Sequence, residues 1–196
     1  MIDTKPANSD ATFNTAPTLL QYNSVLQQCR DLFLKKTEDY GTSWRVLRPV
    51  SITDQIFIKA WRIRQIQEKK VQLIADSIES EFVGIVNYGI MALVQEAAAA
   101  DEDLEWQTGK ALAAYDQQAE AVRQLMLQKN ADYGEAWRQM SQQSFVDLIL
   151  TKLLRIRQII ANDGKTVVSE GAAANFSDIV NYAVFALILM QEAAGK

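Results

Sequence analysis

Apolar residues recur three to four positions apart along most of this chain, so that each such stretch presents one apolar helix face. The first stretch predicts a helix over about 19–38, and a second of the same kind covers about 104–131. Each leads into an Asp-Tyr-Gly triplet that ends in Gly41 or Gly134. Glycine accepts the left-handed backbone that stops a helix, so we expect both helices to end at these triplets.

Two further helices are predicted in each half of the chain. One should begin near Ser51 or Ser144, where a serine can cap free backbone amides. The next should begin near Asp76 and Ser77 in the first half and near Ser169 in the second. This last helix is apolar almost all round, and a helix of that kind has to be central.

The two halves are copies of one unit. Residues 36–66 align with 129–159 without a gap and share 15 of 31 positions, among them the DYG triplet and the Trp-Arg pair that follows it. The alignment resumes one position later, where FVGIVNYGIMAL (82–93) matches FSDIVNYAVFAL (176–187). Self-similarity of this extent indicates an internal duplication.

We therefore predict an all-α fold, a tandem repeat of two three-helix units packed as a pseudo-twofold helical bundle. The first repeat covers 18–100 and the second 101–196, and the polar residues 1–17 are expected to form a flexible tail. A unit whose third helix is apolar on every side cannot cover that helix alone, so the copies should pack together. The junction 97–103 contains neither Gly nor Pro and is predicted to be nearly continuous helix.

The composition limits the partners and the cellular location that we expect for the protein. The net charge of −4 and an isoelectric point near 5.0 give no bulk attraction to a phosphate backbone, so direct nucleic-acid binding is not expected. Cys29 is the only cysteine, which favours a reducing, cytoplasmic location. The most apolar run, 183–190, is shorter than the roughly 20 residues of a membrane span, so no membrane association is expected. Without histidine, any catalysis would depend on carboxylates, other polar groups or an oxygen-bound metal.

Charged and polar positions retained between the copies are the candidates for chemistry. On the second helix of each unit, three charged residues recur: Asp54, Lys59 and Arg62 as Asp147, Lys152 and Arg155. On the third helix, Asn87 and Tyr88 recur as Asn181 and Tyr182 inside apolar surroundings. Asp178 lies three and four positions before this second pair, which puts all three side chains on one face.

These residues admit two interpretations that can coexist. In a structural network, Lys152 and Arg155 would neutralise Asp147 and Asp178, and Asn181 would fix the helix register. In a ligand site, the cations would hold the phosphates of a small molecule, Tyr or Trp would stack on a base, and carboxylates would hold Mg²⁺.

The motifs KNADYGEAWR, the helix with D-x4-K-x2-R and the run DIVNYA together resemble the nucleotide modification associated domain 1 family. That resemblance covers about 80 residues in each half and implies a role on modified nucleotides. More distantly, the helical layout and DIVNY are similar to MazG-type all-α nucleoside triphosphate pyrophosphatases. This second likeness implies Mg²⁺-dependent hydrolysis between the α and β phosphates, with E-x2-E on one helix and E-x2-D on the next.

The chain departs from that second pattern. The second helix of each unit has no E-x2-E, and the third reads Glu81-x2-Gly84 in one copy and Asn175-x2-Asp178 in the other. Each copy thus keeps a different acid of the pair. Either both sites have decayed, which is the simpler explanation, or the pseudo-twofold brings Glu81 and Asp178 together in one composite site.

The resemblance implies a nucleotide-related protein. Its function would be Mg²⁺-dependent hydrolysis of modified nucleoside triphosphates or, alternatively, non-catalytic nucleotide binding or structural interaction with degenerate acids. For hydrolysis, the expected catalytic residues and metal ligands are Asp147, Glu170 and Asp178, with Glu81 as a further ligand. The expected substrate-binding residues are Lys152, Arg155, Asn181, Tyr182, Asp132, Tyr133 and Trp137 of the second copy and Lys59, Arg62, Asn87 and Tyr88 of the first. Further association into a homo-oligomer is left open.

Overall fold

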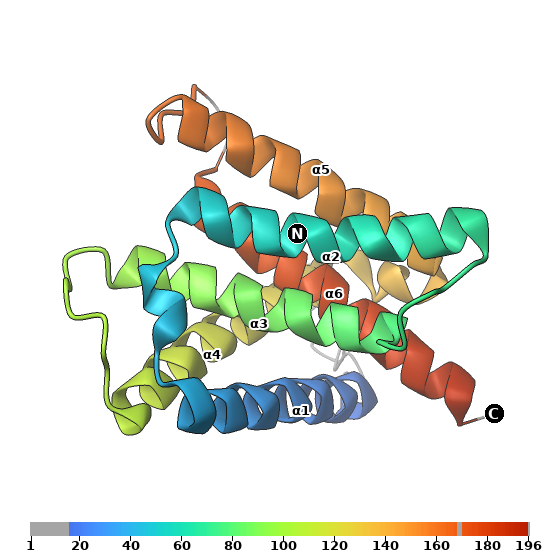
Figure 1. Cartoon of the computed structure of the whole chain (residues 1–196). Coiled ribbons are helices and arrows are strands. Elements are labelled where there is room, and N and C mark those ends of the chain that lie inside the picture. Colours follow the sequence, from blue (N-terminus) through green and yellow to red (C-terminus); the bar gives the residue numbers. More distant parts are fainter. Residues whose placement is uncertain (1–15, 168–169, 196) are drawn as a thin grey trace, which may run out of the picture.

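A computed structural model of the chain describes residues 16–167 and 170–195, and all regular structure in these ranges is helical. The order of elements is α1 (Ala16–Tyr40), η1 (Ser43–Val46), α2 (Pro49–Lys69), α3 (Ile78–Ala97), α4 (Thr108–Tyr133), η2 (Ala136–Gln139), α5 (Gln142–Ala161) and α6 (Ala172–Ala194), where η marks a short 3-10 helix. The same sequence of elements occurs twice (Figure 1). This confirms the predicted all-α tandem fold.

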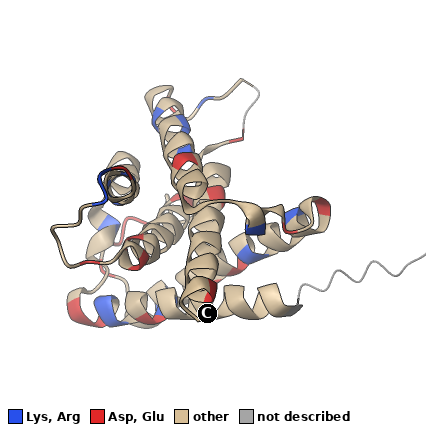
Figure 2. Cartoon of the chain, turned by 90° about the vertical axis from the view of Figure 1, so that its right-hand side faces the viewer, with Lys and Arg blue, Asp and Glu red and all other residues tan. Residues whose placement is uncertain are grey.

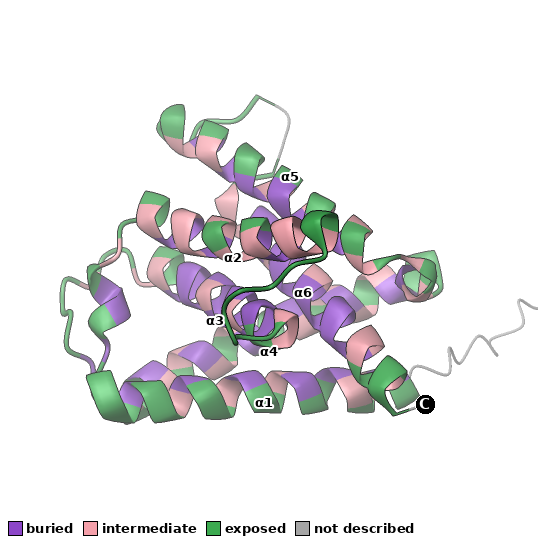
Figure 3. Cartoon of the chain, turned by 45° about the vertical axis from the view of Figure 1, so that its right-hand side comes forward, coloured by how far each residue is buried: buried purple, intermediate pink, exposed green. Residues whose placement is uncertain are grey.

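The helices form three layers of two, with each repeat giving one helix to each layer (Figure 1). Helices α3 and α6 make the central layer, with α2 and α5 on one side and α1 and α4 on the other. The burial pattern follows this order, because the central helices are largely buried and the outer helices turn an exposed face outward (Figure 3). The central pair approaches closely at Gly89, where an added Cβ would lie 2.6 Å from Cγ2 of Val180. Any larger side chain there would push the two repeats apart.

Hydrogen bonds exchanged between the repeats show the pseudo-twofold relation directly. The Tyr22 hydroxyl of the first repeat donates to Oδ1 of Asn181 in the second at 2.7 Å. The equivalent Tyr115 of the second repeat donates to Oδ1 of Asn87 in the first, also at 2.7 Å. A contact that is returned between equivalent residues is the signature of a twofold interface. The chain is therefore built like a dimer fused into one polypeptide.

The outer helices α2 and α5 repeat this reciprocity with charges. Arg157 of α5 pairs with Asp54 of α2 at 2.8 Å, and Arg64 of α2 approaches Asp147 of α5 at 3.7 Å. The four side chains are between about a third and two thirds exposed, so each pair contributes little to stability. Their value here is geometric, since they fix the register of α2 against α5.

The glycines of the DYG triplets end their helices as predicted. Gly134 follows α4 with φ +59° and Gly41 follows α1 with φ +60°, both in the left-handed region. The cap of α3 is also where the sequence predicts it, because Ser77 accepts from the backbone N–H of Ser80. Helix α5 is capped by Ser141 rather than Ser144, whose backbone N–H donates to the Ser141 hydroxyl. The short helices η1 and η2 were not foreseen.

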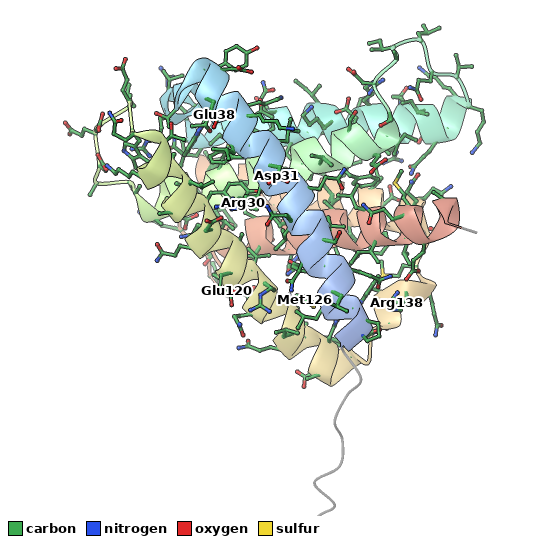
Figure 4. All side chains as sticks on the ribbon, turned by 90° about the horizontal axis from the view of Figure 1, so that it is seen from below. Arg30, Asp31, Glu38, Glu120, Met126 and Arg138 are labelled. Carbon is green, nitrogen blue, oxygen red and sulfur yellow. The ribbon has the colours of Figure 1, made fainter. Side chains whose placement is uncertain are left out.

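The Trp-Arg pair after each DYG triplet fastens its short helix to distant parts of the chain. Arg138 lies beside the start of α1 (Figure 4) and donates to Thr18 Oγ1 at 2.6 Å and Gln21 Oε1 at 2.8 Å. It also pairs with Glu192 at the end of α6. Its equivalent, Arg45, donates to the backbone oxygens of Asp101 and Asp103. The repeated phrase thus has a structural role in both copies.

The prediction of a nearly continuous helix at the junction of the repeats is wrong. Residues between α3 and α4 form turns and irregular chain. Backbone oxygens in this segment accept hydrogen bonds from Thr42 and Arg45. Thr42 Oγ1 donates to the Leu104 oxygen at 2.7 Å and accepts from the Trp106 N–H at 2.9 Å. Together with Arg45 on the Asp101 oxygen, these bonds hold the junction against η1. The helix propensity of the alanines is overridden by these long-range contacts.

Two further boundaries differ from the prediction. Helix α1 begins at Ala16, inside the expected tail 1–17, and the rest of that tail lies outside the described residues. Helix α6 begins at Ala172, and Ser169 also lies outside the described residues. By length and composition α6 could cross a membrane, but 67% of its most apolar window is buried against the other helices. Its apolar character is accounted for by its central position.

Candidate functional site

An ion cluster in the second repeat joins three helices. One carboxylate oxygen of Asp178 in α6 forms an ion pair with Lys152 of α5 at 2.6 Å, and the other oxygen pairs with Lys129 of α4. The Asp178 side chain is only 8% exposed, whereas Lys129 is 44% exposed. A nearly buried carboxylate needs such partners, because desolvation would otherwise disfavour its charge. The cluster thereby fixes α4 and α5 on the central helix.

The first repeat contains a corresponding cluster. Glu81 of α3 receives Lys59 of α2 at 3.1 Å, and Arg62 of α2 pairs with its other oxygen. Arg62 also donates to the backbone oxygens of Ile74 and Asp76 in the loop before α3. All the charges of this cluster are paired, so the first repeat fits the structural interpretation.

The two clusters differ because their carboxylates stand one helical turn apart. Glu81 aligns with Asn175, and Asp178 aligns with Gly84. In the second repeat the acid has thus moved away from the position that would bind Arg155, the equivalent of Arg62. No hydrogen bond or ion pair joins Arg155 to any of the described residues.

Arg155 lines a groove between α5 and the segment leading to α6, here called the cationic groove. Its volume is about 730 Å³. Three cations line it, Lys152, Arg155 and Lys165, against the single acid Glu170. Asn175 forms part of the wall and donates its own amide to the Gly171 oxygen. The groove therefore carries an excess of positive charge on a chain that is acidic overall. Most charged residues of the described chain lie on the outer helices (Figure 2).

A second, smaller hollow lies on the other side of the Asp178 cluster, under the DYG turn. This aromatic cavity has a volume of about 310 Å³ and is lined by Met126, Lys129, Asn130, Tyr133, Ala136, Trp137, Met140, Asp178, Asn181, Tyr182 and Phe185. Trp137 is buried, Tyr182 is half-buried and Tyr133 is exposed at the rim. Because Lys152 lines the groove and Asp178 lines the cavity, their ion pair separates two adjoining hollows.

Burial and neighbouring charges shift the pKa of two side chains that line the cavity, Tyr182 and Lys129. Burial raises the pKa of the Tyr182 hydroxyl, and the carboxylate of Asp178 raises it further, while Lys129 and Arg155 act in the opposite direction. Burial alone would lower the pKa of Lys129. The hydrogen bond that Lys129 donates to Asp178 and the attraction of Asp178 and Glu170 outweigh that effect, so the pKa of Lys129 is raised. Lys129 therefore stays charged at the mouth of the cavity.

The candidate residues of the second copy fall into three groups. Lys152, Arg155 and Glu170 line the cationic groove, whereas Asp178, Asn181, Tyr182, Tyr133 and Trp137 line the aromatic cavity. Asp132 is exposed beside Tyr133. Asp147 is exposed and faces α2 through Arg64, so it lies apart from both hollows.

In the first copy the candidates serve packing. Lys59 and Arg62 hold Glu81, and Asn87 accepts from Tyr115. Tyr88 is a half-buried residue packed against the core.

Some residues of the site were not among the candidates. Lys129 opens the phrase KNADYGEAWR and repeats Lys36, so the duplication itself contained the signal. Lys165 and Asn175 had no such signal, because the equivalent position in the loop before α3 has no lysine and Asn175 replaces an acid. Their contribution depends on how the loop before α6 returns to α5.

The acids do not have the arrangement that Mg²⁺ requires. Among the described residues no three carboxylates come together. Both oxygens of Asp178 are bonded to lysines, and Glu81 is bonded by its own repeat's cations, so the two do not share a composite site. Mg²⁺ takes several oxygen ligands in octahedral order, and this set does not fit one. Binding of the metal stays a prediction, and no chemical step is derived from it.

Fold and site together define a class of protein: a duplicated all-α unit in which cations of the outer helices face a carboxylate on the central helix. The chain belongs to the nucleotide modification associated domain 1 family, whose pattern matches residues 36–95 and 129–190, one segment in each repeat. This confirms the resemblance and the tandem copies. Neither the curated proteins nor the solved structures contain a match. The more distant similarity to MazG-type pyrophosphatases stays a prediction.

Proposed function

We propose that the second repeat binds a phosphorylated small molecule, in the first instance a nucleotide, with its phosphates in the cationic groove. The observation that carries this proposal is Arg155, whose guanidinium lines the groove with no partner among the described residues. A guanidinium presents paired N–H donors that match two phosphate oxygens, so an unpaired one in a groove is suited to phosphate.

The charges around Arg155 support the same interpretation. Lys152 and Lys165 line the groove with it, and Glu170 is the one acid on the wall. Lys152 shares its charge with Asp178, which leaves Arg155 and Lys165 for the ligand. The aromatic cavity offers a place for a base, and the Lys152–Asp178 ion pair joins the wall of this cavity to the wall of the groove.

The first repeat is proposed to be structural. Its equivalent arginine, Arg62, is bonded to Glu81 and to two loop carbonyls, so it offers no free donor set to a phosphate. Duplication would thus have left one copy as scaffold and one as binding half. Binding alone is proposed, because the acids of the second repeat are not gathered around a common point.

Calorimetric titration with nucleoside triphosphates, with and without Mg²⁺, tests this function. Arg155→Ala should weaken binding by about 10-fold or more, because a charge-assisted hydrogen bond contributes roughly 1.5–3 kcal/mol. Lys35→Ala, an exposed lysine of α1 outside the groove, is the matched control and should leave affinity unchanged. Nucleotide binding that survives Arg155→Ala at full strength, or no binding to the intact chain, would overturn the proposal. Product analysis of the same samples decides whether turnover accompanies binding.

A further inference from the structure

Two buried N–H groups, on residues that line the aromatic cavity, have no hydrogen-bond partner among the described residues. They are Nδ2 of Asn181 and Nε1 of Trp137, on side chains that are 4% and 6% exposed. The other end of the Asn181 amide is fixed, because its Oδ1 accepts from the Tyr22 hydroxyl. Nδ2 is therefore held in one direction as a donor. An unsatisfied buried donor is costly, so its retention calls for an explanation.

The first repeat shows what the same position does when it serves packing alone. Asn87 accepts from Tyr115 just as Asn181 accepts from Tyr22, and its Nδ2 likewise has no hydrogen-bond partner among the described residues, but that atom is not fully buried. Where the second repeat has Met126, the first has Phe33, whose ring stacks on Tyr115 at 4.4 Å and lies 6.1 Å from Trp44.

The indole does not distinguish the two copies, since Trp44 also has an unpaired N–H. The side-chain amides differ in burial, because Nδ2 of Asn181 is fully buried and Nδ2 of Asn87 is not. Asn181 is therefore the donor on which the inference depends, and Trp137 is secondary.

The walls of the cavity suit a flat ring. Trp137 stacks on Phe185 at 4.2 Å, and the guanidinium of Arg138 lies 4.5 Å from its ring, so at least part of the indole face is already covered. Tyr182 and Tyr133 supply further aromatic surface. A volume of about 310 Å³ is at the low end of the roughly 300–1,000 Å³ of ligand pockets. This space fits one heterocycle rather than a whole nucleotide.

We propose that the aromatic cavity holds a nucleobase bearing a carbonyl oxygen and that Nδ2 of Asn181 donates to that oxygen. The proposal rests on the proposed function, because it assigns the base of the molecule whose phosphates occupy the cationic groove. A base with an exocyclic amino group at the same position would place donor against donor. The site therefore prefers the keto member of a keto and amino pair.

Matched ligands test this preference on the intact protein. Inosine and adenosine triphosphate differ in a carbonyl against an amino group at one ring carbon, and in an N–H against a bare nitrogen beside it. Uridine and cytidine triphosphate form a second such pair. In calorimetric titration the keto member should bind about 10-fold more tightly in each pair, since one buried hydrogen bond is gained and one unpaired donor is relieved. The ratio of the two affinities is the readout.

Two substitutions locate the effect. Asn181→Asp keeps an oxygen for Tyr22 and replaces the donor with an acceptor, so the keto preference should disappear. Asn87→Asp is the matched control in the first repeat and should leave the ratio unchanged. The comparison of ligands on the unmodified chain stands by itself if Asn181→Asp does not fold.

Tripolyphosphate separates this inference from the function on which it rests. If tripolyphosphate binds but the keto and amino nucleotides bind equally, the base assignment is overturned and the phosphate groove stands. If neither tripolyphosphate nor any nucleotide binds, the proposed function is overturned as well. A keto preference that persists in Asn181→Asp would assign the contact to another group and refute the role of this amide.

Discussion

Replacing Asp178 with asparagine tests how far the second repeat depends on its ion cluster. The change removes the carboxylate that Lys129 and Lys152 share and leaves two ammonium groups facing a neutral amide. Losing one partner of a buried ion pair costs about 3–5 kcal/mol. The side chain of Lys152 is 16% exposed, whereas Lys129 is 44% exposed and can turn to water. We therefore expect a loss at the low end, about 3 kcal/mol in the free energy of unfolding.

Denaturation in urea, followed by circular dichroism, measures this loss. The midpoint should fall with little change in the slope of the free energy against urea concentration. Asp116→Asn is the control, because Asp116 also pairs with a cation, Arg30, but at a surface site where its side chain is 44% exposed. It should cost less than about 1 kcal/mol. If Asp178→Asn costs no more than this control, the cluster does not hold the three helices together and our reasoning fails.

Three other predictions follow from the same structure. Tyr22→Phe and Tyr115→Phe should each lower the free energy of unfolding by about 1–3 kcal/mol, because each removes one cross-repeat hydrogen bond. The two bonds are equivalent, so the two losses should be similar. A large difference between them in urea denaturation would contradict the pseudo-twofold relation. Gly134 has φ +59° and open space around it, so Gly134→Ala should lower the free energy of unfolding by about 1–2 kcal/mol. Gly109→Ala, in the first turn of α4, should leave the free energy of unfolding unchanged or raise it by up to about 1 kcal/mol. Equal shifts of the melting temperature for both variants would argue against the left-handed cap. Burial raises the pKa of the Cys29 thiol from 9.0 to about 12, so its contribution to stability is present below pH 9 and is lost as the pH rises towards 12; a colorimetric thiol reagent at pH 8 should react with this residue only after denaturant is added.

Most of what could be predicted from the sequence followed from the duplication. Identity at the DYG triplets gave the helix ends at Gly41 and Gly134, because the left-handed cap is a local property of glycine. The all-round apolar character of the third helix in each unit predicted its central position, because such a helix has no polar face to expose to water. Both conclusions depend only on neighbours along the chain.

The pairing of side chains could not be predicted in the same way. The predicted pairing of Arg155 with Asp147 does not form, because the Asp147 side chain faces α2, where Arg64 approaches it. The sequence also gave no sign that Lys129 would reach Asp178, since the contact joins helices that meet only in the folded bundle. Long-range contacts similarly overrode the helix propensity of the junction.

A crystal structure of the chain with inosine triphosphate tests the central claim most directly. The account predicts phosphate oxygens within hydrogen-bond reach of Arg155 in the cationic groove, with the base in the cavity beneath Tyr133 and its carbonyl oxygen facing Asn181. Phosphates bound instead at Lys59 and Arg62 of the first repeat, or a base outside the cavity, would contradict it.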